Sequence, residues 1–256
     1  MKLEIGQCTD TGLQRDHNED RLGIFEPRTD ALRRREGVLC AVADGMGGHL
    51  AGEIASQTAI ESLLREYGRQ MERGSKDLRK ALVNAVLSAN RAVWEAGQND
   101  PSRAGMGTTL VAVVIRGGRL IVAHVGDSPA LLLSGGAVRR LTRDHSWVQE
   151  AVARGHLSAE DADRHPYKHV LTRALGSTPE VQVDVSDDVE LEAGDVLVLC
   201  SDGLVRHVRE SELSGVVQDK SAEEAARALV DLANRRGGED NTTVIVCRLL
   251  PEQTRT

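Results

Sequence analysis

The feature that most constrains this chain is an apolar segment that ends at an aspartate, because it occurs three times. The three segments are residues 38–43 before Asp44, residues 120–126 before Asp127 and residues 196–201 before Asp202. Asp and Gly suit turns, so each segment alone predicts only a buried strand followed by a turn. If the three strand ends meet, they form an acidic pocket whose carboxylates repel one another unless cations lie between them.

Hydrophobic periodicity predicts antiparallel strands and amphipathic helices in the rest of the chain. Residues 108–115 and 120–125 are rich in β-branched side chains and are joined by Arg-Gly-Gly-Arg, which is typical of a hairpin. Apolar residues at helical spacing predict helices over 51–67, 78–94 and 222–233. We expect further strands at 3–9, 22–25, 130–133, 137–141, 181–185, 189–191, 195–200 and 242–249, and a charged loop at 30–36. Hairpins in succession, rather than alternating strands and helices, indicate an antiparallel α+β fold.

The composition excludes several classes of function. The 256 residues carry a formal net charge of −7 and only 2% are aromatic. A negative chain disfavours nucleic acid as a partner, and so few aromatic side chains leave little for bases to stack on. The sequence has neither an apolar run long enough for a membrane span nor a signal-peptide pattern. Its four cysteines form no Cys-x-x-Cys pair and mostly lie in apolar runs, so we expect reduced thiols in a cytoplasmic protein.

Five aspartates at the edges of β-rich segments are candidate metal ligands. They are Asp20, Asp44, Asp127, Asp202 and Asp240. Ligands that are all oxygen select Mg²⁺ or Mn²⁺ over zinc or copper. Two such ions about 3.5–4 Å apart lower the pKa of a shared water toward neutrality. Arg15 can bind two phosphate oxygens with its planar fork. These residues indicate a metal-dependent hydrolase, while Asp-Gly turns without function and a single structural Ca²⁺ stay open.

Seven short motifs in a fixed order carry a resemblance to a known family. They are Arg15-x-x-Asn18-Glu19-Asp20, Asp44-Gly45-Met46-Gly47-Gly48, Gly107-Thr108-Thr109, Gly126-Asp127-Ser128, Leu141-Thr142-x-Asp144-His145-Ser146, Ser201-Asp202-Gly203 and Asp240-Asn241-Thr242-Thr243. With them the chain resembles the metal-dependent serine/threonine protein phosphatases of the PPM (PP2C) family, and most of all the compact bacterial members. Any one tripeptide is weak, whereas seven in order, over nearly the whole chain, are highly specific.

The resemblance implies a four-layer α-β-β-α sandwich, in which two antiparallel sheets lie face to face between antiparallel helix pairs. Residues 1–250 would form a single phosphatase domain, and residues 251–256 would be a C-terminal tail. The charged segment 144–176 would be a small flap insertion beside the site; we call it the flap below.

The resemblance also implies a role for each residue of the site. Asp44 would bridge two catalytic ions, Mn²⁺ or Mg²⁺, and the carbonyl of Gly45 would complete the first ion's site. Asp202 and Asp240 would hold the second ion, and Arg15 would bind the substrate phosphate. Asp127, with help from Asp202, would hold a third and more weakly bound ion. Asp20 and Glu19 would act largely through waters bound to the ions. Asn241 would hydrogen-bond to the groups behind the ligands and support them.

Two positions depart from the pattern of the family. Met46 stands where some eukaryotic members have a His that is proposed to protonate the leaving group, and Met has no proton to give. We therefore expect an ion-held water to act as the acid; nearby His49 has no counterpart in the motifs. Pro129 stands where the family often has Arg, and Pro lacks a backbone donor.

The resulting functional prediction is hydrolysis of phosphoserine and phosphothreonine on proteins. Expected partners are a bacterial Ser/Thr protein kinase and its substrates, with no nucleic acid and no membrane span, and the protein is expected to be a monomer. One alternative is a two-metal phosphodiesterase or nuclease, which would favour a basic groove. Another is a binding module without activity, which would have lost metal-binding aspartates. A third is a sporulation-type or stress-response phosphatase, a kind that usually carries sensor domains.

Overall fold

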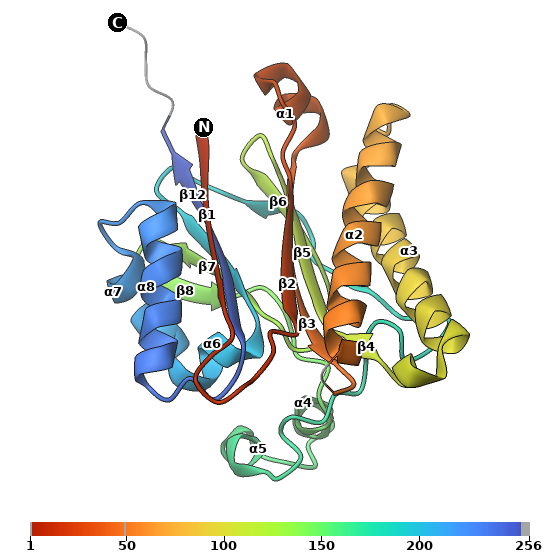
Figure 1. Cartoon of the computed structure of the whole chain (residues 1–256). Helices are drawn as coiled ribbons and strands as arrows, with labels where there is room; N and C mark the ends of the chain where they lie inside the picture. The colour runs from red at the N-terminus through yellow and green to blue at the C-terminus, as the bar shows by residue number, and fades with distance from the viewer. Residues whose placement is uncertain (1, 49, 252–256) are drawn as a thin grey trace, which may run out of the picture.

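The protein has four layers, in the order helices, sheet, sheet, helices (Figure 1). The structure is a computed structural model and describes residues 2–48 and 50–251. His49 and the end of the expected tail, 252–256, lie outside the described residues. The predicted sandwich of two antiparallel sheets between helices is confirmed.

The first sheet joins the two ends of the described chain. Its strands lie in the order β1-β12-β11-β7-β8. They are β1 (Lys2–Asp10), β12 (Thr242–Leu250), β11 (Val196–Cys200), β7 (Ala130–Ser134) and β8 (Ala137–Arg140). β1 and β12 pair along their whole length, from Lys2 opposite Leu250 to Asp10 opposite Thr242. Because β11 and β12 are antiparallel, the end of β11 lies beside the start of β12.

The second sheet has the order β10-β6-β5-β3-β2, with β9 also paired to β6 and β4 to β3. Its strands are β2 (Asp20–Phe25), β3 (Val38–Met46), β4 (Gly107–Thr108), β5 (Leu110–Arg116), β6 (Arg119–Val125), β9 (Asp184–Val185) and β10 (Val189–Glu190). The predicted β5–β6 hairpin is present, with Arg116 opposite Arg119 at its turn. β2 pairs with β3 so that Asp20 lies directly opposite Asp44.

Amphipathic helices cover the outer face of each sheet (Figure 1). α2 (Leu50–Glu72) and α3 (Leu78–Asn99) pack on the second sheet, and their buried faces are largely Ala, Leu and Val. α8 (Ala222–Arg235) packs on the first sheet with the shorter α6 (Asp202–His207) and α7 (Leu213–Val217). Ser221 and Glu224 form a capping box at the start of α8. All three predicted long helices are present.

The two sheets enclose a core of aliphatic side chains. Val42, Val111, Leu199 and Ile245 are fully buried there. Cys40 of the second sheet and Cys247 of the first face each other with their sulfur atoms 3.8 Å apart. Three of the four cysteines are buried and all are free thiols, as the apolar runs around them indicate.

The predictions for two segments were wrong. Residues 30–36 form a helix, α1 (Asp30–Glu36), rather than a loop. The Thr29 hydroxyl accepts a hydrogen bond from the Leu32 amide, and Gly37 ends the helix at a positive φ of 72°, so caps outweigh the charged composition. The strand before Asp44 also does not end there, because β3 continues to Met46 by pairing with β4.

The flap lies at one end of the sandwich (Figure 1). It contains α4 (Trp147–Ala153) and α5 (Ala159–Arg164), each capped by a serine. An isolated bridge between Ser146 and Leu171 closes its base. Two short 3₁₀ turns complete the elements, η1 (Pro101–Arg103) and η2 (Glu210–Glu212).

Candidate active site

One pocket collects most of the predicted site residues at the end of the sandwich nearest the flap. The predicted residues that line it are Arg15, Glu19, Asp44, Gly45, Asp127, Asp202, Asp240 and Asn241. Asp20 lies deeper, with only 2% of its surface exposed. The acidic pocket, as we call it, therefore brings together the ends of strands from both sheets, as the three Asp-terminated segments predict.

Asp44 is held through its backbone by Thr108, the last residue of β4, and by Thr109, which precedes β5. The Asp44 amide donates to the Thr109 hydroxyl over 3.0 Å. The Asp44 carbonyl accepts from the Thr109 amide and from the Thr108 hydroxyl, each over 2.8 Å. These three bonds fix the direction of the Asp44 side chain, because the strand cannot rotate at this residue without breaking them.

Gly45 has to be glycine for packing reasons. A Cβ atom at this position would lie 2.1 Å from the carbonyl oxygen of Gly52 in α2. The Gly45 amide donates to the carbonyl of Glu19 over 3.2 Å. The close approach of β3, α2 and the segment before β2 brings the Gly45 backbone to the pocket wall.

Burial and mutual repulsion raise the pKa values of the carboxyl groups in this pocket. Burial is the largest cause for Asp44, followed by the charges of Asp20 and Asp202, and they raise its pKa well above the usual range. Burial raises the pKa of Asp20 to about 7, although hydrogen bonds from Ser201 and Thr243 act in the opposite direction. Burial and the charge of Asp202 raise the pKa of Asp127 to about 7. In each case burial is the largest cause, so the charged forms of these carboxyl groups are disfavoured unless a cation lies beside them.

Asp127 lies where the chain crosses from the second sheet to the first, between β6 and β7. Its neighbour Gly126 has a φ of 101°, which favours glycine, and its amide donates to Nδ1 of His145 over 3.1 Å. His145 in turn places Nε2 3.3 Å from the Asp184 carboxylate and stacks on His124. A histidine of the sequence motif therefore lies behind the pocket and supports the Asp127 turn.

His124, His145 and Asp184 are also close enough together to hold a metal ion, at a place separate from the acidic pocket. One ligand atom from each of His124, His145 and Asp184 lies within 4.8 Å of the others. Arg173 already pairs with Asp184 over 2.6 Å, however, which satisfies the only anionic member of the group. The acidic pocket has the greater shortage of positive charge.

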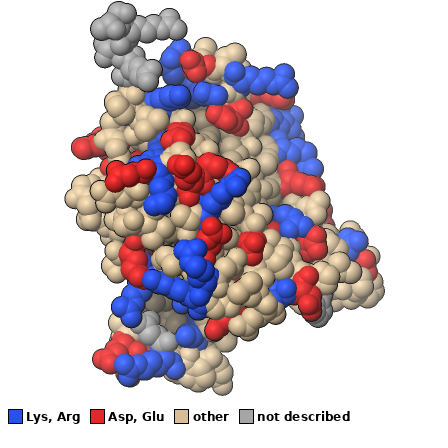
Figure 2. Space-filling model, turned by 60° about the vertical axis from the view of Figure 1, so that its left-hand side comes forward, with Lys and Arg blue, Asp and Glu red and all other residues tan. Residues whose placement is uncertain are grey.

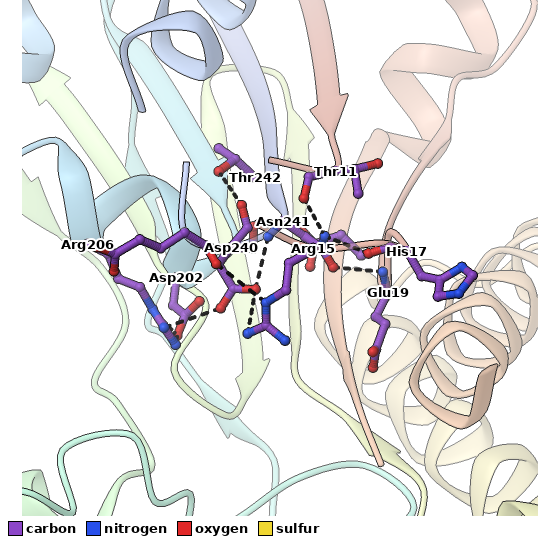
Figure 3. Close-up of polar contacts among 12 residues, drawn as sticks. Thr11, Arg15, His17, Glu19, Asp202, Arg206, Asp240, Asn241 and Thr242 are labelled. Atoms are coloured by element: carbon purple, nitrogen blue, oxygen red, sulfur yellow. Dashed lines mark hydrogen bonds and ion pairs between the residues drawn. The ribbon is translucent and has the colours of Figure 1, made fainter. Parts of the chain in front are cut away.

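On the other side of the pocket, the side chain of Asn241 hydrogen-bonds to three separate residues (Figure 3). Its side-chain NH₂ donates to the carbonyls of Thr11 and His17, each over 2.8 Å. Its side-chain oxygen accepts from the Glu19 amide over 2.8 Å. One buried amide thus joins the start of β12 to the polar segment between β1 and β2, and it places Glu19 and Asp240 on the same pocket.

Two arginines pair with the aspartates of this wall (Figure 3). Arg15 places Nη2 2.9 Å from Oδ1 of Asp240, and 49% of its side chain is exposed at the rim. Arg206 in α6 reaches both Asp202 and Asp240. Arg206 is not among the residues predicted from the sequence, although in helix α6 it is a neighbour of Asp202 at the i,i+4 spacing.

Two carboxylate oxygens, one in the acidic pocket and one buried behind it, lack a partner among the described residues. They are Oδ1 of Asp20 and Oδ1 of Asp202, both buried. A buried anionic oxygen without a hydrogen bond or cation is costly. The aspartates around them offer carboxylate oxygens, the ligand type that Mg²⁺ and Mn²⁺ prefer. The residues present therefore fit divalent ions.

Fold and site together define the class: a sandwich of two antiparallel sheets with a carboxylate-rich pocket at one end is the framework of a metal-dependent phosphatase. A family model described as Protein phosphatase 2C matches residues 17–241. The chain belongs to this family and is a metal-dependent protein serine/threonine phosphatase of the bacterial type, with Mn²⁺ or Mg²⁺ as its cofactors.

Relatives and solved structures agree with this assignment. The chain is 38% identical over 241 residues to the serine/threonine phosphatase stp of Listeria welshimeri, covering 93% of this chain and 92% of the relative. It is 35% identical over 251 residues to the protein phosphatase PhpP of Streptococcus pneumoniae, covering 98% and 99%. It is similar to the crystal structure of the serine/threonine phosphatase PstP/Ppp of Mycobacterium tuberculosis, with a TM-score of 0.84, 38% identity and coverage of 97% and 99%. A structure of the PstP catalytic domain in complex with two manganese ions has a TM-score of 0.81, 36% identity and the same coverage.

Proposed function

We propose that the acidic pocket hydrolyses phosphoserine and phosphothreonine on proteins with two divalent ions held among its aspartates. The observation that carries the proposal is the meeting of Asp44 from one sheet with Asp202 and Asp240 from the other, in a pocket with unpartnered buried carboxylate oxygens. When bound, the ions supply Lewis acidity and lower the pKa of a water so that it can act as the nucleophile near neutral pH.

The family resemblance supplies a role for each residue, and the positions in the pocket support these roles. Asp44, fixed by its three backbone hydrogen bonds, would be a ligand of both ions, and the Gly45 carbonyl would complete the first site. Asp202 and Asp240 would hold the second ion, and Asp127 with Asp202 would hold a third. The residues behind them are Asp20 and Glu19, which orient waters, and Asn241, which fixes the Glu19 backbone.

Arg15 binds the substrate phosphate. Its half-exposed guanidinium stands at the rim of the pocket, where Nε also donates to the Glu239 carbonyl over 3.4 Å. A guanidinium has five N–H donors, and these contacts use two of them. The remaining donors can bind a pair of phosphate oxygens, which orients the phosphorus toward the pocket.

The test is phosphate release from a phosphothreonine peptide in Mn²⁺, with a chelator control. Loss of a residue that only supports a metal ligand costs up to about 100-fold in activity. Asp202 is itself a proposed ligand, so Asp202→Ala is expected to lower kcat/KM by at least that factor. Asp187→Asn, an exposed aspartate away from the pocket, is the matched control and should keep full activity. Activity that survives chelation or Asp202→Ala would reject the two-ion site.

The charge distribution argues against the nuclease alternative. On the face drawn in Figure 2, the described basic and acidic side chains are interspersed and form no continuous basic groove. The chain as a whole carries a net charge of −7. A duplex or single strand of nucleic acid would need a basic track leading to the pocket.

We further infer the setting in which the enzyme works. Its relatives are named serine/threonine phosphatases, which supports phosphoproteins as substrates and a Ser/Thr protein kinase, with that kinase's targets, as the opposing partner. Within the described residues, none of the helices is both long and apolar enough to cross a membrane. We place the enzyme in the cytoplasm as a monomer, with residues 1–250 as one domain and 144–176 as its flap. Comparison of phosphoproteomes with and without the gene would identify the targets, and unchanged phosphoserine and phosphothreonine sites would reject the kinase partner.

A further inference from the structure

Arg206 occupies the carboxylates that the second ion needs. Its Nε lies 3.0 Å from Oδ2 of Asp202, its Nη2 contacts the same oxygen, and its Nη1 lies 3.2 Å from Oδ2 of Asp240. Figure 3 shows the guanidinium turned toward both side chains. A single arginine therefore bridges the end of β11 to the turn before β12.

Most oxygens of the Asp202 and Asp240 carboxylates already accept hydrogen bonds or pair with an arginine. Oδ1 of Asp240 accepts from the Asn241 amide over 2.9 Å and pairs with Arg15 over 2.9 Å, while Oδ2 pairs with Arg206. Oδ2 of Asp202 is taken by Arg206 and only its Oδ1 lacks a partner. A divalent ion that binds both aspartates has to share these oxygens with a guanidinium or displace it.

The geometry of α6 places the Arg206 side chain next to that of Asp202. Ser201 begins α6, so Asp202 and Arg206 lie at i and i+4 on one face of the helix. Arg206 is also a lining residue of the pocket and only 28% of its side chain is exposed, so solvent screens the pair weakly.

We propose that Arg206 is a built-in competitor of the second divalent ion, and that it sets the Mn²⁺ concentration at which the enzyme becomes active. This inference rests on the proposed function. A permanent positive charge on Asp202 and Asp240 lowers the repulsion in the acidic pocket and at the same time weakens the attraction of a second cation. Arg206 is a positioning residue that acts through these ligands, and it does not need to touch the substrate.

The competition predicts opposite effects on metal affinity and on metal-free stability. Arg206→Gln is expected to bind Mn²⁺ roughly five- to tenfold more tightly by isothermal titration calorimetry, the range expected for the loss of one partly screened ion pair. The same variant should unfold at a lower temperature than wild type in chelator, because the aspartates lose their counter-charge. A residue with a merely structural role would lower the melting temperature without tightening Mn²⁺ binding.

Two further variants sharpen the test. Arg227→Gln removes an i,i+4 pair of the same kind, with Glu223 on the exposed face of α8, and should leave Mn²⁺ affinity unchanged. Arg206→Lys keeps the charge but loses the fork, so its Mn²⁺ affinity should lie between those of wild type and Arg206→Gln. It also keeps the test usable if the Gln variant folds poorly.

A double-mutant cycle separates this inference from the proposed function. In an Asp202→Asn background, the effect of Arg206→Gln on Mn²⁺ affinity should become smaller without vanishing, because the pair between Arg206 and Asp240 remains. Mn²⁺ affinity that is unchanged or weaker in Arg206→Gln, with the wild type binding Mn²⁺ normally, would overturn the competitor role alone. A wild type that binds no Mn²⁺ and releases no phosphate would overturn both.

Discussion

His145 shows how one residue behind the pocket can set the geometry of another within it. Its Nδ1 accepts the hydrogen bond from the Gly126 amide, so the ring proton of the neutral form lies on Nε2, toward Asp184. Its backbone amide donates to the Gly126 carbonyl over 3.0 Å, and its carbonyl accepts from Thr172 of the flap over 2.8 Å. The turn that carries Asp127 and the base of the flap therefore share one support.

The stability that His145 contributes should depend on pH. Burial, followed by the neighbouring His124 and Arg173, lowers the pKa of His145 to about 4 from its usual value of about 6.5. The folded state then favours the neutral ring, so this stability is present above pH 6.5 and is lost as pH falls toward 4. In His145→Asn, the side-chain oxygen can replace Nδ1 as acceptor without titrating in this range.

We expect the free energies of unfolding of wild type and His145→Asn to become more similar as the pH falls. The excess free energy of unfolding of wild type over His145→Asn should shrink by about 1–2 kcal/mol between pH 7 and pH 5, measured by urea denaturation in chelator. The acidic groups of the pocket titrate in both proteins and cancel in the difference. A difference that is constant with pH would show that His145 is not buried as a neutral ring.

Among single residues, the sequence could identify the carboxylates but not their partners. Asp44, Asp202 and Asp240 each follow or precede an apolar strand, which is a local signal. Arg206 required knowing that a helix begins at Asp202, and this chain has no apolar periodicity long enough there to predict one. The three-part support of Asn241 joins residues more than 200 positions apart, and no local pattern reports such contacts.

At the scale of elements, the junction of β3 and α2 positions the first half of the site. Gly52 lies in the first turn of α2, and a Cβ atom there would lie 1.8 Å from Oε2 of Glu19. The helix can therefore approach β3 closely while the Glu19 carboxylate passes over it toward the pocket. Gly45 and Gly52 together allow three segments of backbone to meet.

Gly52→Ala should consequently impair activity more than folding. The added methyl displaces the end of the Glu19 side chain, and we expect kcat/KM with a phosphothreonine peptide to fall by about 10- to 100-fold. Alanine favours a helix by about 1 kcal/mol over glycine, which offsets part of the crowding in the free energy of unfolding.

Gly97→Ala in α3 is the matched control for this change. Its Cβ atom would lie 3.4 Å from the Arg103 carbonyl oxygen, an ordinary contact. That variant should be as active as wild type and slightly more stable. Full activity in Gly52→Ala would show that the position of Glu19 does not matter to catalysis.

The elements themselves were mostly predictable, and the exceptions have physical causes. Long helices and hairpins have periods that a sequence displays directly. α1 is short and charged, so only its caps distinguish it from a loop. β3 extends past Asp44 because β4, a two-residue strand more than 60 positions away, supplies the hydrogen bonds.

At the scale of the whole molecule, bound ions should stabilise the fold. Asp20 lies directly opposite Asp44, and like charges directly across a strand pair are destabilising. Mn²⁺ at about 100 times its dissociation constant is expected to stabilise the native state by about 2.7 kcal/mol. For a chain of this size that corresponds to a rise in melting temperature of about 5–10 °C.

Thermal unfolding in a Mn²⁺ series would measure this effect, and excess chelator should reverse it. Asp44→Asn is expected to abolish most of the rise while raising the melting temperature in chelator, because it removes a buried carboxyl group whose raised pKa lowers the free energy of unfolding at neutral pH. A melting temperature that is independent of Mn²⁺ in the wild type would contradict ion binding by the folded state.

The sequence could predict the sandwich because seven motifs spread over the chain carry a family resemblance, and because hairpins dominate its middle. It could not predict how the two sheets align. That alignment depends on packing between Val42, Val111, Leu199 and Ile245, all aliphatic and interchangeable in any pattern of hydrophobicity.

The alignment of the sheets has a consequence for evolution and for engineering. Asp20 and Asp44 belong to the second sheet, whereas Asp202 and Asp240 adjoin strands β11 and β12 of the first. The packing of the aliphatic layer therefore sets the distance between these two pairs of proposed site residues. Repacking that layer, for instance at Leu199, would retune ion affinity from a distance without altering any ligand. The metal concentration that the enzyme requires therefore depends in part on its fully buried aliphatic residues.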